Sequence, residues 1–323
     1  MKNFIRSFFA AIVLALLSHA LVFAQDIRNC NIIPDLTYKI IDGTEIKLDL
    51  YSPITKTTNK LPLVVFIHGG GWDSGDKSLV QKANRGKLLQ EFLDNNYIVA
   101  SIDYRLTSKT THFPAPAEDC KDAIKWLRMN AESYNIDTNN IGLWGTSAGG
   151  HLALLVAYTS DKTFVGDNNL DKYSANVSYV IDHYGPVDLI KLFKPEASNA
   201  YLKMLNVLDN ERYEKRQTKL ASFCGLDTSK EQQKISNICG LYSPINYVSQ
   251  TSVPTIILQG SGDNIVELYQ AKLLRDNLEK NNTSSKLVIF KGGDHGLNNL
   301  SSENEKKLIE TSVNFAKEHT TQP

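Results

Sequence analysis

Continuous apolar runs of strand length recur along this chain, and segments with helical periodicity separate them. The apolar runs cover residues 61–67, 97–102, 141–144, 179–181, 255–258 and 287–290. The helix-like segments cover residues 79–94, 115–130, 148–158, 266–280 and 303–317. A strand without alternating polar residues is typical of a sheet that helices cover on both faces. The pattern therefore predicts an α/β fold with a mostly parallel sheet between two helical layers.

Two segments depart from this alternation. Residues 37–51 alternate apolar and polar around Asp42-Gly43, which predicts an antiparallel hairpin at the start of the domain. Residues 188–244 form a polar stretch, helical in pieces, that is much longer than a usual strand-to-helix connection. We expect this insertion to act as a lid or to shape a substrate pocket. A surface insertion that takes no part in binding is the alternative.

The first residues have the pattern of a targeting segment. Lys2 and Arg6 precede an apolar run at 8–17, and Val22-Phe23-Ala24 supplies a signal-peptidase motif. This pattern predicts a secretory signal peptide over residues 1–24, followed by one domain over residues 25–323. An uncleaved membrane anchor is the alternative, because the apolar segment almost reaches a spanning length. We therefore expect a secreted or periplasmic protein that has no membrane attachment once the signal is removed.

Charge and cysteine content argue against several classes of protein. Lys and Arg total 35 and Asp and Glu total 35 among 323 residues, so the formal net charge is zero and no nucleic-acid partner is expected. The four cysteines form no C-x-x-C pair, and we expect no metal site. Cys224 and Cys239 share one polar region, and whether they form a disulfide is left open.

The segment G-T-S-A-G-G at residues 145–150 carries the clearest chemical signal. It follows one apolar run and precedes a helix-like segment, which places Ser147 on a sharp strand-to-helix turn. Small neighbours are needed there because the backbone is strained and the helix packs closely. The glycines also resemble a dinucleotide-binding loop, but other features of that loop are missing, and we expect no cofactor. Ser147 is therefore the candidate nucleophile.

A serine nucleophile needs donors for the charge that develops on its substrate. The sequence H-G-G-G-W at residues 68–72 follows the apolar run 61–67, and consecutive glycines leave backbone N–H groups accessible. The amides of Gly70, Gly71 and Ala148 are the candidate oxyanion-hole donors. We interpret His68 as a residue that braces this loop.

The base and the acid are expected late in the chain, in the order serine, acid, histidine. His295 lies in G-G-D-H-G, just after the apolar run 287–290, and is the candidate base. Asp263 follows the run 255–258 and is the candidate acid that orients the imidazole. Asp294 and Glu267 are the alternatives for the acid. His151 lies four residues after Ser147 and is expected to point away from it.

These motifs together resemble a known family. They are H-G-G-G-W at 68–72, D-Y-R-L at 103–106, F-P-A-P-A-E-D at 113–119, G-T-S-A-G-G at 145–150, Asp263 and G-D-H-G at 293–296. The chain resembles the α/β-hydrolase fold, and within it the hormone-sensitive-lipase-like carboxylesterases and the bacterial feruloyl and acetylxylan esterase group. The resemblance implies Ser147, Asp263 and His295 as a catalytic triad, without metal or organic cofactor.

Two positions depart from the pattern of these relatives. In the lipase-like branch D-Y-R-L usually leads into Ala-Pro, whereas Thr107-Ser108-Lys109 follows here, which favours the plant-polysaccharide esterase group. The loop that bears Asp263 often begins His-Gly in the family, whereas Gln259-Gly260 stands here. We expect this second difference to be a local change of packing.

The sequence thus predicts a secreted serine carboxylic-ester hydrolase that forms an acyl-enzyme. Its expected substrates are acetyl or feruloyl esters of carbohydrates, or other small esters. A formamidase-type amide hydrolase of the same fold is one alternative, and a binding module on a hydrolase scaffold is the alternative that is not an enzyme.

Overall fold

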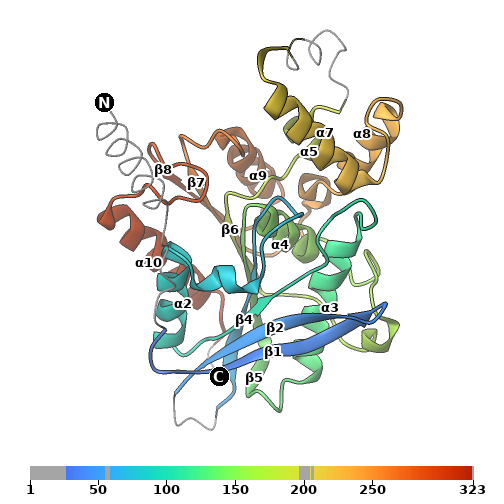
Figure 1. Ribbon diagram of the computed structural model, residues 1–323. Coiled ribbons are helices and arrows are strands. Elements are labelled where there is room, and N and C mark those ends of the chain that lie inside the picture. The colour runs from blue at the N-terminus through green and yellow to red at the C-terminus, as the bar shows by residue number, and fades with distance from the viewer. Residues whose placement is uncertain (1–26, 55–58, 196–203, 205–206, 322–323) are drawn as a thin grey trace, which may run out of the picture.

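An eight-stranded sheet forms the centre of the computed structural model (Figure 1). The structure describes residues 27–54, 59–195, 204 and 207–321, so the predicted signal peptide at 1–24 lies outside the described residues. The strands are β1 (Cys30–Ile41), β2 (Thr44–Pro53), β3 (Leu61–Ile67), β4 (Ile98–Ile102), β5 (Ile136–Thr146), β6 (Tyr179–His183), β7 (Thr255–Gly260) and β8 (Ser285–Phe290). Their spatial order is β1-β2-β4-β3-β5-β6-β7-β8.

The sheet is parallel except at its amino-terminal edge. The β1–β2 hairpin is antiparallel and turns at Asp42 and Gly43, which have φ angles of 49° and 77°. Positive φ at both turn positions matches the right-handed twist of the flanking strands. β2 also pairs antiparallel with β4, and the pairs from β4 through β3 to β8 are all parallel. The predicted α/β sheet with an antiparallel opening hairpin is confirmed.

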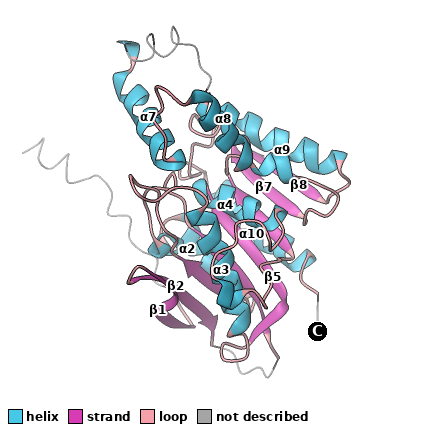
Figure 2. Ribbon diagram, turned by 90° about the vertical axis from the view of Figure 1, so that its right-hand side faces the viewer, coloured by secondary structure: helices cyan, strands magenta, loops and turns pink. Residues whose placement is uncertain are grey.

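Helices cover both faces of this sheet, and Figure 2 shows α3 and α4 in front of the strands. The helices are α2 (Asn84–Asp94), α3 (Ala115–Met129), α4 (Ala148–Tyr158), α5 (Leu189–Phe193), α7 (Asn210–Cys224), α8 (Gln232–Leu241), α9 (Leu268–Lys280) and α10 (Ser302–Glu318). Shorter 3-10 turns are η1 (Lys77–Gln81), η2 (Asn168–Leu170) and η3 (Pro244–Tyr247). None of the helices in the described part of the chain combines the length and the apolar character needed to cross a membrane.

The core lies in two layers, one on each face of the sheet. On β3, Leu63 and Val65 pack into the layer beneath α3, α4 and α9, whereas Val64 and Phe66 pack beneath α2 and α10. All four side chains have an exposed fraction of 0%. Burial on both faces explains why the apolar run shows no alternation.

The predicted single helix at 79–94 is two elements. Ala83 has a φ of 54°, which ends η1 and starts α2 in a new direction. The buried side chain of Asn84 then donates through Nδ2 to the carbonyl oxygens of Gly296 and Leu297, at 3.3 Å and 3.1 Å. These hydrogen bonds connect the start of α2 to the loop after β8. Helical periodicity does not reveal such a long-range contact.

The insertion at 188–244 contains α5, α7 and α8, and the last two lie together at one end of the molecule (Figure 1). Aromatic packing anchors it. Phe223 of α7 stacks on Phe113 with ring centroids 3.9 Å apart and meets Trp72 edge-on at 5.3 Å. Leu220 and Phe193 are buried beside them. A role as a lid stays a prediction.

Candidate active site

Ser147 occupies the turn between β5 and α4. Its backbone has φ 54° and ψ −120°, a conformation that residues other than glycine rarely adopt. The Ser147 N–H donates to the carbonyl oxygen of His183 at the end of β6, at 2.8 Å. The turn thus projects the Ser147 hydroxyl from the carboxyl-terminal edge of the sheet.

The glycines that flank this turn are required by close backbone approach. A Cβ on Gly145 would collide with the carbonyl group of Gly149, and a Cβ on Gly149 would collide with the carbonyl oxygens of Ile67 and His68. The sharp turn and the tight seating of α4 on β3 therefore leave no room for side chains here.

Three side chains that are far apart in the sequence meet at this edge. Ser147 Oγ lies 2.9 Å from His295 Nε2, and His295 Nδ1 lies 2.8 Å from Asp263 Oδ2. An ionised carboxylate only accepts hydrogen bonds, so Nδ1 carries the proton and donates to Asp263. Nε2 is then free to accept the proton of the Ser147 hydroxyl, which is the arrangement that activates a serine.

The surroundings of Asp263 keep its carboxylate charged. Burial raises the pKa of Asp263, but the hydrogen bonds from His295 and from the Val266 amide outweigh this effect, so the net pKa is below its usual value. The amides of Ile265 and Val266 both donate to Oδ1 at 2.9 Å. Gln259 Nε2 donates to Oδ2 at 3.0 Å. The difference at position 259 is therefore not confined to packing, because Gln259 contacts the acid directly.

Neither alternative residue for the acid contacts the imidazole. Asp294 Oδ1 accepts from the Asn298 amide at 3.0 Å, within its own loop. Glu267 precedes α9 and lines the pocket wall with an exposed side chain. Neither carboxylate is bonded to His295.

The other histidines near the site are buried and neutral. His68 donates from Nδ1 to the Gly69 carbonyl oxygen at 2.7 Å and stacks on Tyr104, while burial lowers the His68 pKa to about 4. His151 Nε2 donates to the Tyr242 carbonyl oxygen at 2.7 Å, and burial lowers its pKa to about 4. Both rings are thus held by backbone carbonyls, and His151 is not bonded to Ser147.

The candidate oxyanion donors face the same cavity. Gly70 has φ 114° and Gly71 has φ 59°, which exposes successive N–H groups of this loop. Ala148 is the first residue of α4, where backbone N–H groups lack partners within the helix. Among the described residues, no acceptor is bonded to these three N–H groups. Gly69 packs so closely on the serine turn that a Cβ there would lie 2.8 Å from the Thr146 carbonyl oxygen.

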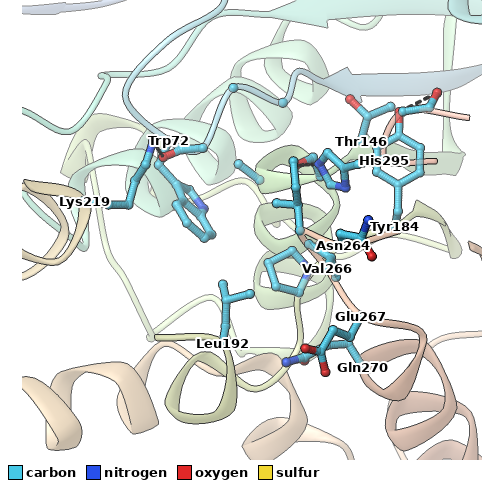
Figure 3. Close-up of a pocket in the computed structure, with 18 of the residues that line it drawn as sticks. Trp72, Thr146, Tyr184, Leu192, Lys219, Asn264, Val266, Glu267, Gln270 and His295 are labelled. Carbon is cyan, nitrogen blue, oxygen red and sulfur yellow. Dashed lines mark hydrogen bonds between the residues drawn. The ribbon is translucent and has the colours of Figure 1, made fainter. Parts of the chain in front are cut away.

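These groups open into a cavity of about 760 Å³ (Figure 3). In Figure 3, Trp72 and Lys219 lie on one side, and His295 and Tyr184 lie on the other. Leu192, from the insertion, contributes to the wall between them. The volume falls in the range of pockets that enclose a small organic ligand.

Sequence reasoning missed two residues beside the site. The Tyr184 ring meets the His295 ring edge-on, with centroids 5.0 Å apart. Its position directly after β6, at the same sheet edge as Ser147, is a signal that could have identified it. Lys219 of α7 donates from Nζ to the Gly71 carbonyl oxygen at 3.1 Å and to both carboxylate oxygens of Asp73 at 2.6 Å. No local pattern in the insertion indicates that contact.

Within the described residues, no three His, Cys, Asp or Glu side chains gather closely enough to hold a metal ion. The cysteines are free thiols, and the thiols of Cys224 and Cys239 contact each other between α7 and α8. This contact, together with burial, raises the pKa of the Cys239 thiol.

Comparison with known proteins shows the family to which the chain belongs. The family model BD-FAE matches residues 48–278. Esterase LipC of Mycobacterium tuberculosis is 26% identical over 72% of this chain and 51% of its own length. The non-reducing polyketide synthase atr1 of Stereocaulon alpinum is 35% identical over 40% of this chain, and the match spans only 5% of that synthase.

A solved structure supports the same assignment at the level of the fold. A truncated carbohydrate esterase from gut microbiota superposes with a TM-score of 0.71 at 22% identity, covering 91% of this chain and 99% of that one. The predicted resemblance to α/β-hydrolase esterases is therefore confirmed, and the chain belongs to the BD-FAE family of α/β-hydrolases.

Proposed function

We propose that this protein is a serine carboxylic-ester hydrolase in which Ser147 is the nucleophile, His295 the general base and Asp263 the orienting acid. The observation that carries the proposal is the continuous hydrogen-bond chain, 2.9 Å from Ser147 Oγ to His295 Nε2 and 2.8 Å from His295 Nδ1 to Asp263 Oδ2. Family membership supports it independently.

In the acylation half of the reaction, His295 Nε2 takes the proton from Ser147 Oγ as the oxygen attacks the ester carbonyl carbon. The carbonyl oxygen becomes an oxyanion. The C–O bond to the alcohol then breaks, and the proton on Nε2 passes to the departing alcohol. Asp263 stabilises the imidazolium through its bond to Nδ1 and does not itself become protonated.

In the second half, water replaces the alcohol beside His295. Nε2 removes a proton from this water, and the hydroxide oxygen attacks the acyl carbon on Ser147. The bond between the acyl carbon and Ser147 Oγ breaks, and Oγ regains the proton from Nε2. The carboxylic acid leaves, and the enzyme returns to its starting state.

The N–H groups of Gly70, Gly71 and Ala148 serve as the oxyanion donors in this proposal. They line the cavity and have no acceptor among the described residues, so a developing negative charge can use them without breaking other bonds. One such donor typically contributes about 3 kcal/mol to transition-state stabilisation.

The proposed substrates are acetyl or feruloyl esters of carbohydrates, and the proposed location is outside the cytoplasm. The likeness to a carbohydrate esterase supports the carbohydrate class, and the aromatic wall formed by Trp72 and Phe193 offers flat apolar surface of the kind that sugar and aryl rings pack against. The signal-peptide pattern at residues 1–24 supports export.

Covalent labelling tests the nucleophile directly. A fluorophosphonate probe is expected to label the wild-type protein and the Ser74→Ala variant, and not the Ser147→Ala variant. Ser74 is a suitable control because its hydroxyl also lines the cavity, where it donates to the Gly70 carbonyl oxygen at 2.7 Å. Equal labelling of Ser147→Ala and wild type would remove Ser147 from its role.

A substrate screen tests the reaction class. Acetylated xylan, methyl ferulate, aryl esters of increasing acyl length and a formylated arylamine are compared by kcat/KM. The proposal predicts faster turnover of at least one ester class than of the formamide. Faster turnover of the formamide would identify an amide hydrolase instead.

A further inference from the structure

Positive charge is concentrated around the cavity. The whole chain has equal numbers of acidic and basic side chains, so this concentration does not follow from composition. Among the described residues that line the cavity, Glu267 is the one with a carboxylate. The basic residues that line it are Arg85, Lys191, Lys194, Lys215, Arg216 and Lys219.

Two of these cations are neutralised locally. Lys215 forms an ion pair with Glu211 one helical turn away, and Lys219 forms one with Asp73. Their charges are therefore largely balanced before a substrate enters the cavity.

Among the described residues, three cations of the cavity lack such a counter-charge. In the part of the chain that the structure describes, no carboxylate forms an ion pair with Arg85, Lys191 or Lys194. Lys191 and Lys194 flank the end of α5 and are exposed. Arg85 is half-buried on α2, and its Nε donates to the Leu79 carbonyl oxygen at 2.8 Å. A guanidinium group has five donors, so its terminal N–H groups retain capacity for a further acceptor.

Arg85 lies on the His295 side of the cavity. The preceding residue, Asn84, bonds to the carbonyl oxygens of Gly296 and Leu297 directly after His295, and Arg85 lines the cavity together with Tyr184. Burial raises the pKa of Tyr184, and the charge and hydrogen bonding of Arg85 oppose that rise, in agreement with a guanidinium close to the tyrosine hydroxyl. The same Tyr184 ring packs against His295 at 5.0 Å. A substrate group bound by Arg85 would therefore be held one side chain away from the reacting imidazole.

We propose that the preferred esters carry a carboxylate group, which Arg85 binds by charge-assisted hydrogen bonds and which Lys191 and Lys194 attract at the rim. This inference rests on the proposed ester hydrolysis. A half-buried guanidinium suits a planar carboxylate because it can donate two parallel hydrogen bonds. The carboxylate belongs either to the acyl part or to the alcohol part of the ester, and the experiment distinguishes the two.

Matched ester pairs test the proposal on the protein that comprises residues 25–323, without the predicted signal peptide. The acyl arm compares mono-4-nitrophenyl adipate with 4-nitrophenyl hexanoate, and the alcohol arm compares an O-acetylated methyl glucuronide with the corresponding methyl glucoside. In at least one arm, kcat/KM is expected to be about tenfold higher for the anionic ester at low salt. Because Lys191 and Lys194 are exposed, the preference is expected to shrink as ionic strength rises.

Variants assign this preference to the named residues. Arg85→Met is expected to reduce the anionic-to-neutral ratio of kcat/KM about fivefold or more. Lys87→Met is the matched control, because it removes the same charge from the same helix, where Lys87 pairs with Glu305 outside the cavity. It is expected to leave the ratio within about twofold of wild type. The double variant Lys191→Met/Lys194→Met changes only exposed side chains and is expected to weaken the salt dependence.

The outcomes separate this inference from the proposed function. Hydrolysis of the neutral esters without any anionic preference, or equal ratios in Arg85→Met and Lys87→Met, would overturn the inference alone. Absence of hydrolysis in every arm would overturn the proposed function. In that case calorimetric titration of Ser147→Ala still decides the inference, with methyl glucuronide compared with methyl glucoside and monomethyl adipate compared with methyl hexanoate. If neither carboxylate-bearing ligand binds more tightly than its neutral partner, the inference is contradicted.

Discussion

At the scale of single residues, Asp263 is the most fully bonded member of the site. Its two carboxylate oxygens accept from His295, Gln259 and the amides of Ile265 and Val266. Four donors on one carboxylate fix its plane and therefore fix the imidazole that bonds to it. The local backbone turn after β7, rather than His295 alone, holds the acid in position.

Replacing Asp263 with Asn tests this role. The Asn side chain has a single acceptor oxygen, so it cannot accept from Nδ1–H at one atom and from two backbone N–H groups at the other. The imidazole is therefore expected to adopt the other tautomer. We expect kcat to fall by about 10³-fold to 10⁴-fold. The measurement is steady-state kinetics on an aryl ester.

Asp294→Asn is the control for this prediction. It alters the carboxylate adjacent to His295 in the sequence, which bonds to Asn298 and not to the imidazole. We expect kcat to change by less than about threefold. Comparable losses in the two variants would show that Asp263 is not the orienting acid.

At the scale of elements, α7 is fastened to the candidate oxyanion loop. Lys219 bonds to the Gly71 carbonyl oxygen and to Asp73, on either side of Trp72. Gly71 has a φ of 59°, which strains any residue with a side chain, and a Cβ here would displace the Lys219 ammonium because it would lie 2.5 Å from Nζ. The insertion therefore contacts the backbone whose N–H groups face the cavity, and its position affects the geometry of those groups.

Lys219→Met is expected to lower kcat about tenfold while KM changes less. A displaced oxyanion donor loses more of its stabilisation of the transition state than of its binding to the ester in the ground state. Lys215→Met is the matched control, since Lys215 lies one turn away on α7 and its ion pair with Glu211 does not reach the loop. Kinetics of both variants, with melting temperatures, provide the measurement. A loss that appears in KM alone would argue against a positioning role for Lys219.

At the scale of the whole molecule, burial of neutral histidines couples folding to pH. Burial lowers the pKa of His68 and His151 to about 4 and that of His183 to about 3. The unfolded chain binds protons on these residues below about pH 6.5, whereas the folded protein does so only near pH 3 to 4. Asp182 acts in the opposite direction, because burial raises its pKa to about 7 and its contribution to stability is lost as pH rises through 7.

Three histidines outweigh one carboxyl group, so the free energy of unfolding is expected to fall as pH drops from about 7 to about 4. Each histidine contributes a loss on the order of 2 kcal/mol by pH 5. Asp182→Asn removes the opposing contribution and is expected to make the fall steeper. Denaturant unfolding curves across this pH range measure the effect, and a flat profile would contradict it.

The sequence predicts the sheet well because each strand carries its own signal. The run L-P-L-V-V-F-I at 61–67 is apolar at nearly every position, and β3 is buried on both faces as that pattern requires. The glycines around Ser147 likewise predict the turn, because their small size is a local requirement. The triad roles remain predictions, although the structure brings the three side chains together.

Long-range contacts explain what the sequence does not reveal. Phe113 and Phe223 stack although 110 positions separate them in the sequence. Asn84 bonds to Gly296, in the loop after β8, across a separation of 212 positions. The path of the insertion and the part played by Gln259 depend on such contacts. No periodicity or motif near these residues encodes their partners.

The order of the three site residues along the chain also has a consequence for biosynthesis. Ser147 emerges from the ribosome long before His295, and Asp263 lies between them. A growing polypeptide therefore has its hydroxyl exposed but no imidazole to activate it until the last strand of the sheet has been made. Nascent chains are thus expected to be inert towards esters in the cell that synthesises them, and reactivity begins only when translation has passed β8.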